Sequence, residues 1–244
     1  MLIKVLVNGA KGRMGRVICK EFEKLDYIKI IAKSDSKNEL RKYINSDLLK
    51  FDIAIDFTSS NCVYSNALDI INANIRPVIG TSGITYNQLQ KLKQLCKIKN
   101  LGGIIASNFS IGAILMMKYA EFIAKYFAKT EIIEYHHDKK DDIPSSTAKE
   151  TLQLIKSSNQ SICDIFTGQK VNKNSKILIH SIRLPGFISC QDILCGSIGE
   201  TLTIRHNIID RKCFINGVVF ACKKVMDLTN LEYGLNSILG KNIK

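Results

Sequence analysis

Short apolar runs alternate with amphipathic segments over roughly the first half of the chain. Continuous apolar runs typical of buried strands cover residues 3–7, 28–32, 52–58, 76–79 and 101–106. Apolar positions at helical spacing cover residues 13–25, 62–72 and 86–97. Because strands and helices alternate, we predict a doubly wound parallel sheet, with ligands bound beyond the carboxyl ends of its strands.

The second half has a different pattern. Helical spacing covers residues 111–127, 148–155 and 220–239, and β-like runs cover 130–133, 176–182, 187–193, 201–206 and 212–220. Strands that follow one another without intervening helices favour antiparallel pairing. We therefore predict an α/β chain, in which the parallel-sheet domain is accompanied by an α+β domain with an open mixed sheet, largely antiparallel.

Composition narrows the classes of function. The chain has 35 basic and 22 acidic residues and a net charge of +13, which attracts anions. Its lysines are spread widely and are not interleaved with aromatic residues, so we expect no nucleic-acid partner. No apolar run approaches the roughly 20 residues that span a bilayer. The N-terminal apolar run is too short for a signal-peptide core, so we expect a cytoplasmic protein without a membrane partner.

The eight cysteines are scattered along the chain. They form no C-x-x-C pair, and the histidines do not stand at the spacing of zinc ligands. We therefore expect reduced thiols and no metal site.

A glycine motif follows the first strand directly. Gly9, Gly12 and Gly15 are spaced G-x-x-G-x-x-G between the strand and the first helix. Glycines there allow a pyrophosphate to approach the backbone at a helix N-terminus, which predicts a Rossmann-like dinucleotide site. The alternative is a tight strand–helix turn without a ligand. The predicted cofactor-binding residues of this loop are Gly9, Ala10, Lys11, Gly12, Arg13 and Met14.

Asp35 stands near the end of the second strand, about 20 residues after the glycines, where an acid binds the adenosine ribose hydroxyls. A carboxylate there repels the extra phosphate of NADPH, and Lys33 and Lys37 soften that repulsion. We expect NADH to be preferred, with some use of NADPH. The alternative is that Asp35 is a solvated turn residue.

The segment 134–148 gathers ionisable groups between a strand and a helix. His136, His137 and Lys140 are followed by a Pro-Ser-Ser-Thr run that opens the helix. Histidine moves protons near neutral pH, and a lysine beside a helix N-terminus binds carboxylates. This pattern predicts an anion site with acid–base chemistry. The alternatives are a structural histidine and a capping box formed by Thr147 and Glu150.

This segment resembles the signature E-x-H-H-x-x-K-x-D-x-P-S-G-T-A of the dihydrodipicolinate reductase family, with Ser146 in place of the glycine. The family motifs D-F-T, G-T-T-G and A-x-N-F-S-x-G resemble residues 56–58, 80–83 and 106–112. The resemblance implies a discontinuous dinucleotide-binding domain, 1–109 with 212–244, and a substrate-binding and oligomerisation domain, 110–211. It also implies residues that line the nicotinamide: Gly80, Thr81, Ser82, Ala106, Ser107, Asn108 and Phe109.

The resemblance further implies a reaction. Enzymes of this family reduce the cyclic dicarboxylate 4-hydroxy-tetrahydrodipicolinate with NADH, NADPH or both, in the route to diaminopimelate and lysine. His136 resembles the catalytic acid and Lys140 its assistant. His137, Ser146 and Thr147 resemble residues that bind the substrate. The family is usually tetrameric, which implies a homo-oligomer.

Two departures from the family pattern keep other functions open. Ser146 replaces the glycine, and the segment 185–191 stands where the family has a G-x-H stretch. One alternative is a related NAD(P)-dependent dehydrogenase for another small amino or imino dicarboxylate. The other is a dinucleotide-binding regulator with weakened catalysis.

Overall fold

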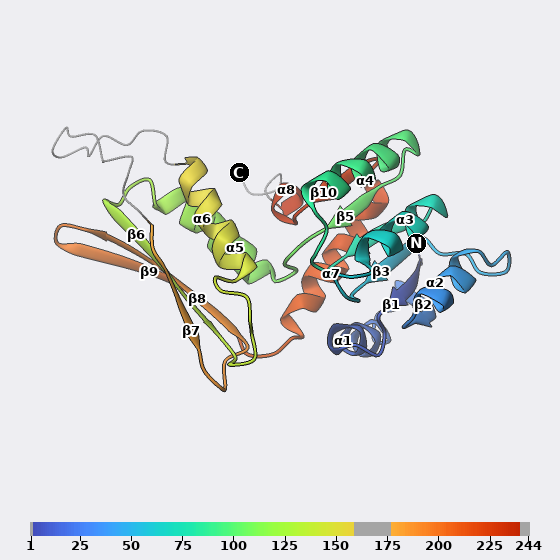
Figure 1. Ribbon diagram of the computed structural model, residues 1–244, viewed down its shortest axis with the longest axis horizontal. Helices are drawn as coiled ribbons and strands as arrows, with labels where there is room; N and C mark the ends of the chain where they lie inside the picture. Colours follow the sequence, from blue (N-terminus) through green and yellow to red (C-terminus); the bar gives the residue numbers. More distant parts are fainter. Residues whose placement is uncertain (1, 159–176, 240–244) are drawn as a thin grey trace. The chain divides into compact units, whose positions relative to one another are not determined.

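The computed structural model describes residues 2–158 and 177–239. The chain forms two compact units, each described here by itself. The first unit combines Met1–Ser110 with Arg211–Lys244, and the second is Ile111–Asp210 (Figure 1).

The first unit is built on a six-stranded sheet. Its strand order is β10-β5-β4-β3-β1-β2, and every neighbouring pair is parallel. This confirms the predicted parallel sheet. The strands are β1 (Ile3–Asn8), β2 (Ile28–Ser34), β3 (Ile53–Asp56), β4 (Arg76–Ile79), β5 (Gly103–Ile105) and β10 (Leu231–Tyr233).

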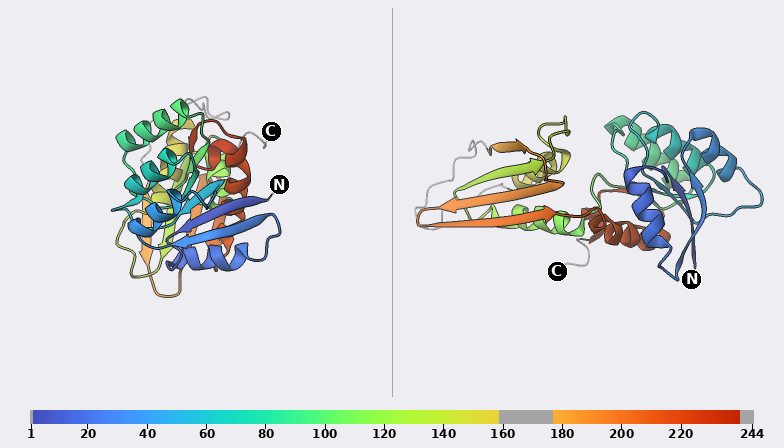
Figure 2. Two further views of the ribbon diagram at one scale, coloured as in Figure 1. Left: turned by 90° about the vertical axis from the view of Figure 1, so that its right-hand side faces the viewer. Right: turned by 90° about the horizontal axis from the view of Figure 1, so that it is seen from below.

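Helices cover both faces of this sheet. Contacts join α2 (Lys37–Ile44), α3 (Val63–Asn72) and α4 (Tyr86–Ile98) into one layer, and α1 (Arg13–Phe22) and α7 (Cys213–Lys224) into another. Figure 2 shows α4 and α7 on opposite sides of the strands. The core between sheet and helices includes the fully buried Ile71, Leu92 and Leu6.

Helix α2 was not predicted. It is only eight residues long, and its apolar face, Leu40 with Tyr43 and Ile44, is too short to stand out as a helical pattern in the sequence. Ser36 nevertheless caps it, since its side chain accepts a hydrogen bond from the Glu39 N–H.

The C-terminal prediction was wrong in two places. Residues 212–220, expected as a strand, belong largely to helix α7. Residues 220–239, expected as one helix, are helical at both ends, in α7 up to Lys224 and in α8 (Asn236–Leu239), but contain the strand β10 between them. Ile215, Val218 and Cys222 are buried at helical spacing, although the aromatic and β-branched content of this run favours strands. The edge strand β10 is only three residues long and carries little pattern of its own.

The second unit is a four-stranded sheet with the order β7-β6-β8-β9. Its strands are β6 (Lys129–His136), β7 (Ile179–Arg183), β8 (Ser189–Ser197) and β9 (Glu200–Ile208). The pair β6–β7 is parallel and the other pairs are antiparallel, which confirms the mixed sheet. Helices α5 (Ile111–Ile123) and α6 (Ser146–Ser158) pack on each other, and α5 also contacts β9.

Strand β6 extends three residues beyond its predicted end at Ile133. Glu134 and His136 therefore lie in the strand and not in the following loop. Both are buried, as alternate residues on one face of the sheet.

Candidate active site

The glycine loop joins β1 to α1 with little room for side chains. Gly9 has φ +83°, and a Cβ added to it would lie 2.3 Å from the Phe57 carbonyl oxygen. Gly12 precedes α1 in an extended conformation, without a side-chain cap, and the first turn contains no acidic residue. Arg13 and Met14 form that turn. The helix therefore presents backbone N–H groups and the positive end of its dipole, which suits a pyrophosphate.

Asp35 lies beside this loop, as predicted for a residue at the end of the second strand. The parallel register pairs Asn8 with Ser34, which brings the ends of β1 and β2 together. The Lys11 N–H donates to Asp35 Oδ1 over 2.6 Å. Lys11 Nζ lies 3.8 Å from Asp35 Oδ2 but is largely exposed, so this ion pair is weak. Ala10 is buried within the same loop.

A buried carboxylate, Asp56, organises three strand ends. It receives hydrogen bonds from Asn8 Nδ2 (2.7 Å) and Asn66 Nδ2 (2.9 Å) on Oδ2. Its Oδ1 receives the Thr58 hydroxyl (2.7 Å) and the Thr81 hydroxyl (2.8 Å). These donors come from β1, α3 and the loops after β3 and β4. The sequence pattern contained Asp56 only as part of a motif and gave no sign of this role.

The remaining predicted cofactor residues follow β4 and β5 at the same sheet edge. Gly80 packs against the Phe57 ring, because an added Cβ would lie 2.1 Å from Cε1. Phe57 in turn packs against Phe109, with ring centroids 5.5 Å apart and ring planes tilted by 54°. Thr81, Ala106 and Phe109 are buried, Asn108 is half-buried, and Ser82 and Ser107 are exposed. All predicted cofactor residues thus belong to loops or helix starts at the carboxyl ends of parallel strands.

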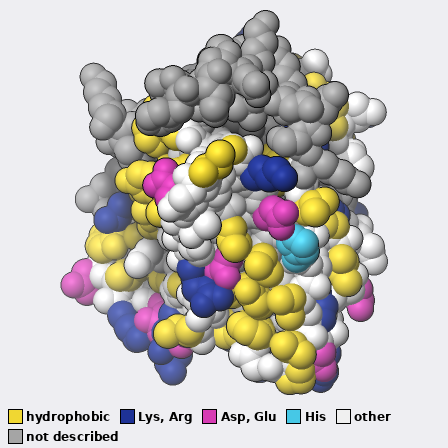
Figure 3. All heavy atoms as spheres, turned by 90° about the vertical axis from the view of Figure 1, so that its left-hand side faces the viewer, with side chains coloured by type: hydrophobic (Ala, Val, Ile, Leu, Met, Phe, Trp, Pro, Cys, Tyr) yellow, Lys and Arg dark blue, Asp and Glu magenta, His cyan; other side chains and the backbone are white. Residues whose placement is uncertain are grey.

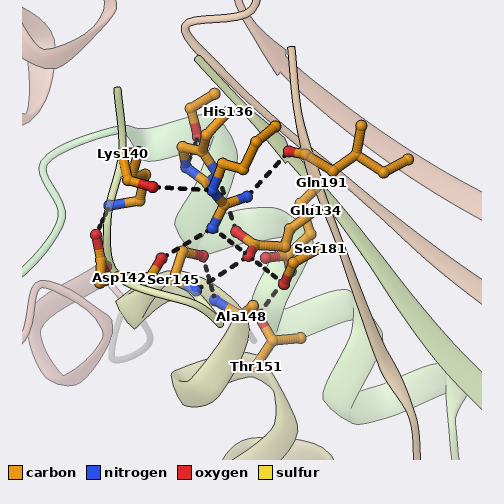
Figure 4. A network of polar contacts seen from close by, with 12 residues as sticks. Glu134, His136, Lys140, Asp142, Ser145, Ala148, Thr151, Ser181 and Gln191 are labelled. Carbon is orange, nitrogen blue, oxygen red and sulfur yellow. Dashed lines mark hydrogen bonds and ion pairs between the residues drawn. The ribbon is translucent and has the colours of Figure 1, made fainter. Parts of the chain in front are cut away.

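The second unit holds a polar cluster around Glu134, which is fully buried (Figure 4). Glu134 Oε1 accepts hydrogen bonds from Arg183 Nη2 (2.8 Å), the Ser181 hydroxyl (2.6 Å) and the Ser145 N–H (3.2 Å). Its other oxygen, Oε2, lies 2.8 Å from His136 Nδ1. These two atoms lack a well-directed hydrogen bond to any neighbour, so they are close by distance alone and form an ion pair only when His136 is protonated.

Burial by itself would raise the pKa of Glu134, because a buried carboxylate is poorly solvated. Contacts with His136, Ser181, Arg183 and Ser145 outweigh burial and hold the pKa well below its usual range. Glu134 is therefore a buried negative charge at neutral pH.

Arg183 also fixes the loop that carries Lys140. Its Nε donates to the Lys140 carbonyl oxygen (3.2 Å), and its Nη2 to the Asp142 carbonyl oxygen (2.8 Å). Lys140 Nζ forms an ion pair with the Asp142 carboxylate. His137 is half-buried at the start of this loop, and its carbonyl oxygen accepts the Lys140 N–H over 3.2 Å.

Helix α6 begins at Ser146, and its cap is Ser145. The Ser145 hydroxyl accepts the Ala148 N–H over 3.2 Å. This corrects the expectation of a capping box between Thr147 and Glu150. Thr147 lies inside the first turn, where its carbonyl oxygen accepts the Thr151 hydroxyl (2.8 Å).

Neither a metal site nor a membrane span is present in the part of the chain that the structure describes. Over residues 2–158 and 177–239, no three His, Cys, Asp or Glu side chains are grouped to hold a metal ion. The helices of the same ranges are too short or too polar to cross a bilayer.

Sequence comparison accounts for nearly the whole chain. Residues 3–109 match the description "Dihydrodipicolinate reductase, N-terminus", and residues 112–239 match "Dihydrodipicolinate reductase, C-terminus". The chain belongs to the dihydrodipicolinate reductase family.

Individual reductases support this membership. The chain is 45% identical to the 4-hydroxy-tetrahydrodipicolinate reductase of Legionella pneumophila (strain Lens), with 98% of the chain and 100% of the relative covered. It is 44% identical to that of Coxiella burnetii (strain Dugway 5J108-111), with the same coverage. The dipicolinate-bound dihydrodipicolinate reductase from Paenisporosarcina sp. TG-14 is 35% identical, with a TM-score of 0.82 over 98% of this chain and 100% of that chain.

More distant structures share only the fold. The myo-inositol 2-dehydrogenase of Lactobacillus plantarum is 9% identical, with a TM-score of 0.61 over 95% of this chain and 91% of that chain.

Two departures from the dihydrodipicolinate reductase pattern have a structural context. Ser146 is exposed at the start of α6, and its φ is not positive, since Asn74 and Asn100 are the only non-glycine residues with positive φ in the described ranges. A serine is therefore accommodated there without backbone strain.

The second departure, 185–191, enters strand β8. Gln191 is buried, and its Nε2 donates to the Thr151 hydroxyl on α6 over 2.8 Å. The Ser189 hydroxyl lies 3.1 Å from His136 Nε2. Sequence reasoning missed both contacts. The antiparallel register pairs His136 with Ser189 and Glu134 with Gln191, and this pairing cannot be deduced from local patterns.

Proposed function

We propose that this protein reduces 4-hydroxy-tetrahydrodipicolinate to tetrahydrodipicolinate with NADH, NADPH or both, in diaminopimelate and lysine biosynthesis. The observation that carries the proposal is the full-length match to proteins named 4-hydroxy-tetrahydrodipicolinate reductase, at 44–45% identity. The substrate loses water to give a conjugated imine, which takes a hydride at one carbon and a proton at the neighbouring carbon. The reaction therefore needs a hydride donor, a proton donor and groups that hold two carboxylates.

The first unit would bind the dinucleotide. Residues 9–14 fit a pyrophosphate, because the loop is tight and the first turn of α1 contains no acidic residue. Asp35, beside the loop, would accept hydrogen bonds from the adenosine ribose hydroxyls. The residues Gly80, Thr81, Ser82 and 106–109 would line the nicotinamide. The bound nicotinamide supplies the hydride, and the protein supplies orientation and protons.

His136 would deliver the proton that completes the reaction. Its imidazole is held at the end of β6 between Glu134 and Ser189. A histidine next to a carboxylate donates protons efficiently near neutral pH. Lys140 would assist by stabilising negative charge that develops on the substrate.

The substrate carboxylates would bind at the start of α6. Ser146 and Thr147 lie in its first turn, where backbone N–H groups and the helix dipole attract an anion. His137 and Lys140 on the preceding loop add donors. Ser146 would contribute a hydroxyl in place of the family glycine.

We further propose a homo-oligomer, a tetramer by analogy with the family, that associates through the second unit. Apolar side chains on the hairpin β8–β9 are exposed to solvent, including Leu194, Ile198 and Leu202. Figure 3 shows hydrophobic side chains between charged ones on this part of the surface. The register pairs Cys195 with Leu202, so Leu194 and Leu202 lie on opposite faces of the sheet, and the analogy with the family carries this proposal.

We also propose that the protein is cytoplasmic and binds neither nucleic acid nor membranes. No disulfide joins the seven described cysteines to one another, as in proteins of reducing compartments. The net charge of +13 would attract an anionic cofactor and a dicarboxylate.

A coupled assay tests the proposed reaction. The protein is mixed with dihydrodipicolinate synthase, its two substrates and NADH or NADPH, and the absorbance of the reduced cofactor is followed. We expect rapid oxidation, with the two cofactors compared directly. Absence of oxidation, with NADH still bound by calorimetry, would contradict the reductase proposal and favour another substrate or a regulator.

A further inference from the structure

The two carboxylate oxygens of Glu134 contact different neighbours. Oε1 accepts all three well-directed hydrogen bonds, from Arg183, Ser181 and the Ser145 N–H. Oε2 faces only the His136 ring, at 2.8 Å from Nδ1. The carboxylate is therefore fixed by its first oxygen, and its second oxygen lies beside Nδ1 without a well-directed hydrogen bond to it.

The other ring nitrogen has a different kind of neighbour. His136 Nε2 lies 3.1 Å from the Ser189 hydroxyl, which can either donate or accept a hydrogen bond. An ionised carboxylate can only accept. In the neutral imidazole, a hydrogen on Nδ1 is favoured by the negative charge of Glu134 beside it, and the lone pair of Nε2 then faces the Ser189 hydroxyl.

We propose that Glu134 is a positioning residue for proton transfer by His136. It keeps Nδ1 protonated throughout the reaction and leaves Nε2 as the nitrogen that releases and regains the proton. This inference rests on the proposed function of His136 as the acid. In the transfer, the Nε2–H bond breaks, a C–H bond forms on the substrate, and the imidazolium becomes the neutral Nδ1–H imidazole.

Other charged groups lie near the His136 ring. Arg183 on β7 contacts Glu134 through Oε1, and Lys140 and Asp142 lie on the loop after β6. Burial raises the pKa of the Asp142 carboxyl, but Lys140, and to a smaller extent His136, lower it, and the net shift is downwards. Glu134 is the one whose oxygen meets a ring nitrogen, so it sets which nitrogen carries the hydrogen.

Glu134→Gln replaces the two equivalent carboxylate oxygens with one acceptor, the amide oxygen, and one donor, the amide NH₂. The amide oxygen can take the place of Oε1 and keep the three donors, which preserves the local structure. The amide NH₂ then takes the place of Oε2 and donates to Nδ1. We expect the neutral imidazole to switch its hydrogen from Nδ1 to Nε2.

The tautomer is measured by ¹⁵N NMR of histidine-labelled protein without substrate. The chain has only four histidines, and His136→Asn assigns the relevant signals by their loss. We expect Nδ1–H in the wild type, Nε2–H in Glu134→Gln, and Nδ1–H in the control Ser189→Ala, which keeps Glu134. Nε2–H in the wild type would overturn the proposal even if Glu134→Gln failed to fold.

The kinetic readout is the pH profile of kcat/KM. An acid must be protonated, so activity falls as pH rises through its titration. In Glu134→Gln, loss of the negative charge disfavours the imidazolium. The decrease of kcat/KM with rising pH should therefore occur at a pH lower by about one unit or more than in the wild type. We also expect kcat to decrease by about 10²-fold or more, as for a lost general acid. An unmoved profile in folded Glu134→Gln would refute the positioning role.

Different results would contradict the reductase proposal and the positioning role of Glu134. If the coupled assay gives no reduction, the NMR comparison still tests the contact between Glu134 and His136. If reduction proceeds but the tautomer does not respond to Glu134→Gln, the reductase proposal stands and the positioning role falls.

Discussion

Single side chains of the second unit differ in chemistry because their surroundings differ. Glu134 stays charged in the interior because Arg183 and two further donors compensate its burial. Lys140 is less enclosed and pairs with Asp142. Burial raises the pKa of Asp142, but the contact with Lys140 outweighs burial, and the pKa is lowered. A substrate carboxylate would therefore compete with Asp142 for the Lys140 ammonium.

The first prediction at this scale concerns the acid. His136→Ala should lower kcat by about 10²–10⁴-fold, the typical contribution of a general acid, while NADH binding changes little. Steady-state kinetics and calorimetry measure the two effects. His180→Ala is a matched control, because His180 also lies in this sheet and pairs with a carboxylate, that of Glu131. An unchanged kcat in His136→Ala would exclude this role.

The second prediction concerns cofactor choice. Asp35→Ala should weaken NADH relative to NADPH, because the carboxylate proposed to bind the ribose hydroxyls and to repel the extra phosphate is lost. The ratio of kcat/KM for the two cofactors is the measurement. Asp47→Ala removes an equal charge from an exposed loop before β3 and should leave the ratio unaltered. If the ratio is the same in both variants, Asp35 does not contact the ribose.

At the scale of elements, the end of β6 and the start of α6 are joined by polar contacts. Ser145 donates its N–H to Glu134 on β6 and caps α6 through its hydroxyl. Gln191 on β8 and Thr151 on α6 add a second buried bond between sheet and helix. The helix N-terminus is thereby held at a fixed place relative to His136.

Loss of the cap tests this connection. Ser145→Ala should destabilise the protein by about 1 kcal/mol, since an orphan N–H of α6 loses its acceptor. Urea unfolding followed by circular dichroism measures the change. Ser146→Ala, one residue further and exposed, should remain within roughly 0.5 kcal/mol of the wild type. Equal stabilities of the two variants would mean that the Ser145 hydroxyl does not stabilise the helix.

At the scale of the whole molecule, the chain leaves the first unit at Ser110 and returns to it at Arg211. The return is well anchored, because Gly217 on α7 packs directly on the backbone of Phe109, where a Cβ would lie 1.9 Å from the carbonyl oxygen. Strand β10 then completes the sheet beside β5. The sheet of the second unit keeps exposed apolar residues on its hairpin.

A substitution on this hairpin tests the proposed assembly. Ile198→Asp places a charge on a fully exposed apolar position and should shift the protein towards smaller species, because a charge is costly at an apolar contact. Sedimentation velocity gives the distribution. Leu48→Asp, at an exposed position of the first unit, should not change it. A wild type that sediments as a monomer would contradict the oligomer itself.

The sequence determined the parallel sheet, the glycine loop with Asp35, and the resemblance of segment 134–148 to the family signature. These depend on the spacing of apolar residues along each element and on residues that are close together in the chain. It failed where local signals conflict, as in α7, whose β-branched residues obscure a helical spacing. Only the tertiary structure revealed the hydrogen bonds that converge on the Asp56 carboxylate and the contacts His136–Ser189 and Gln191–Thr151. Those contacts depend on strand register and helix packing between distant residues, which no local pattern encodes.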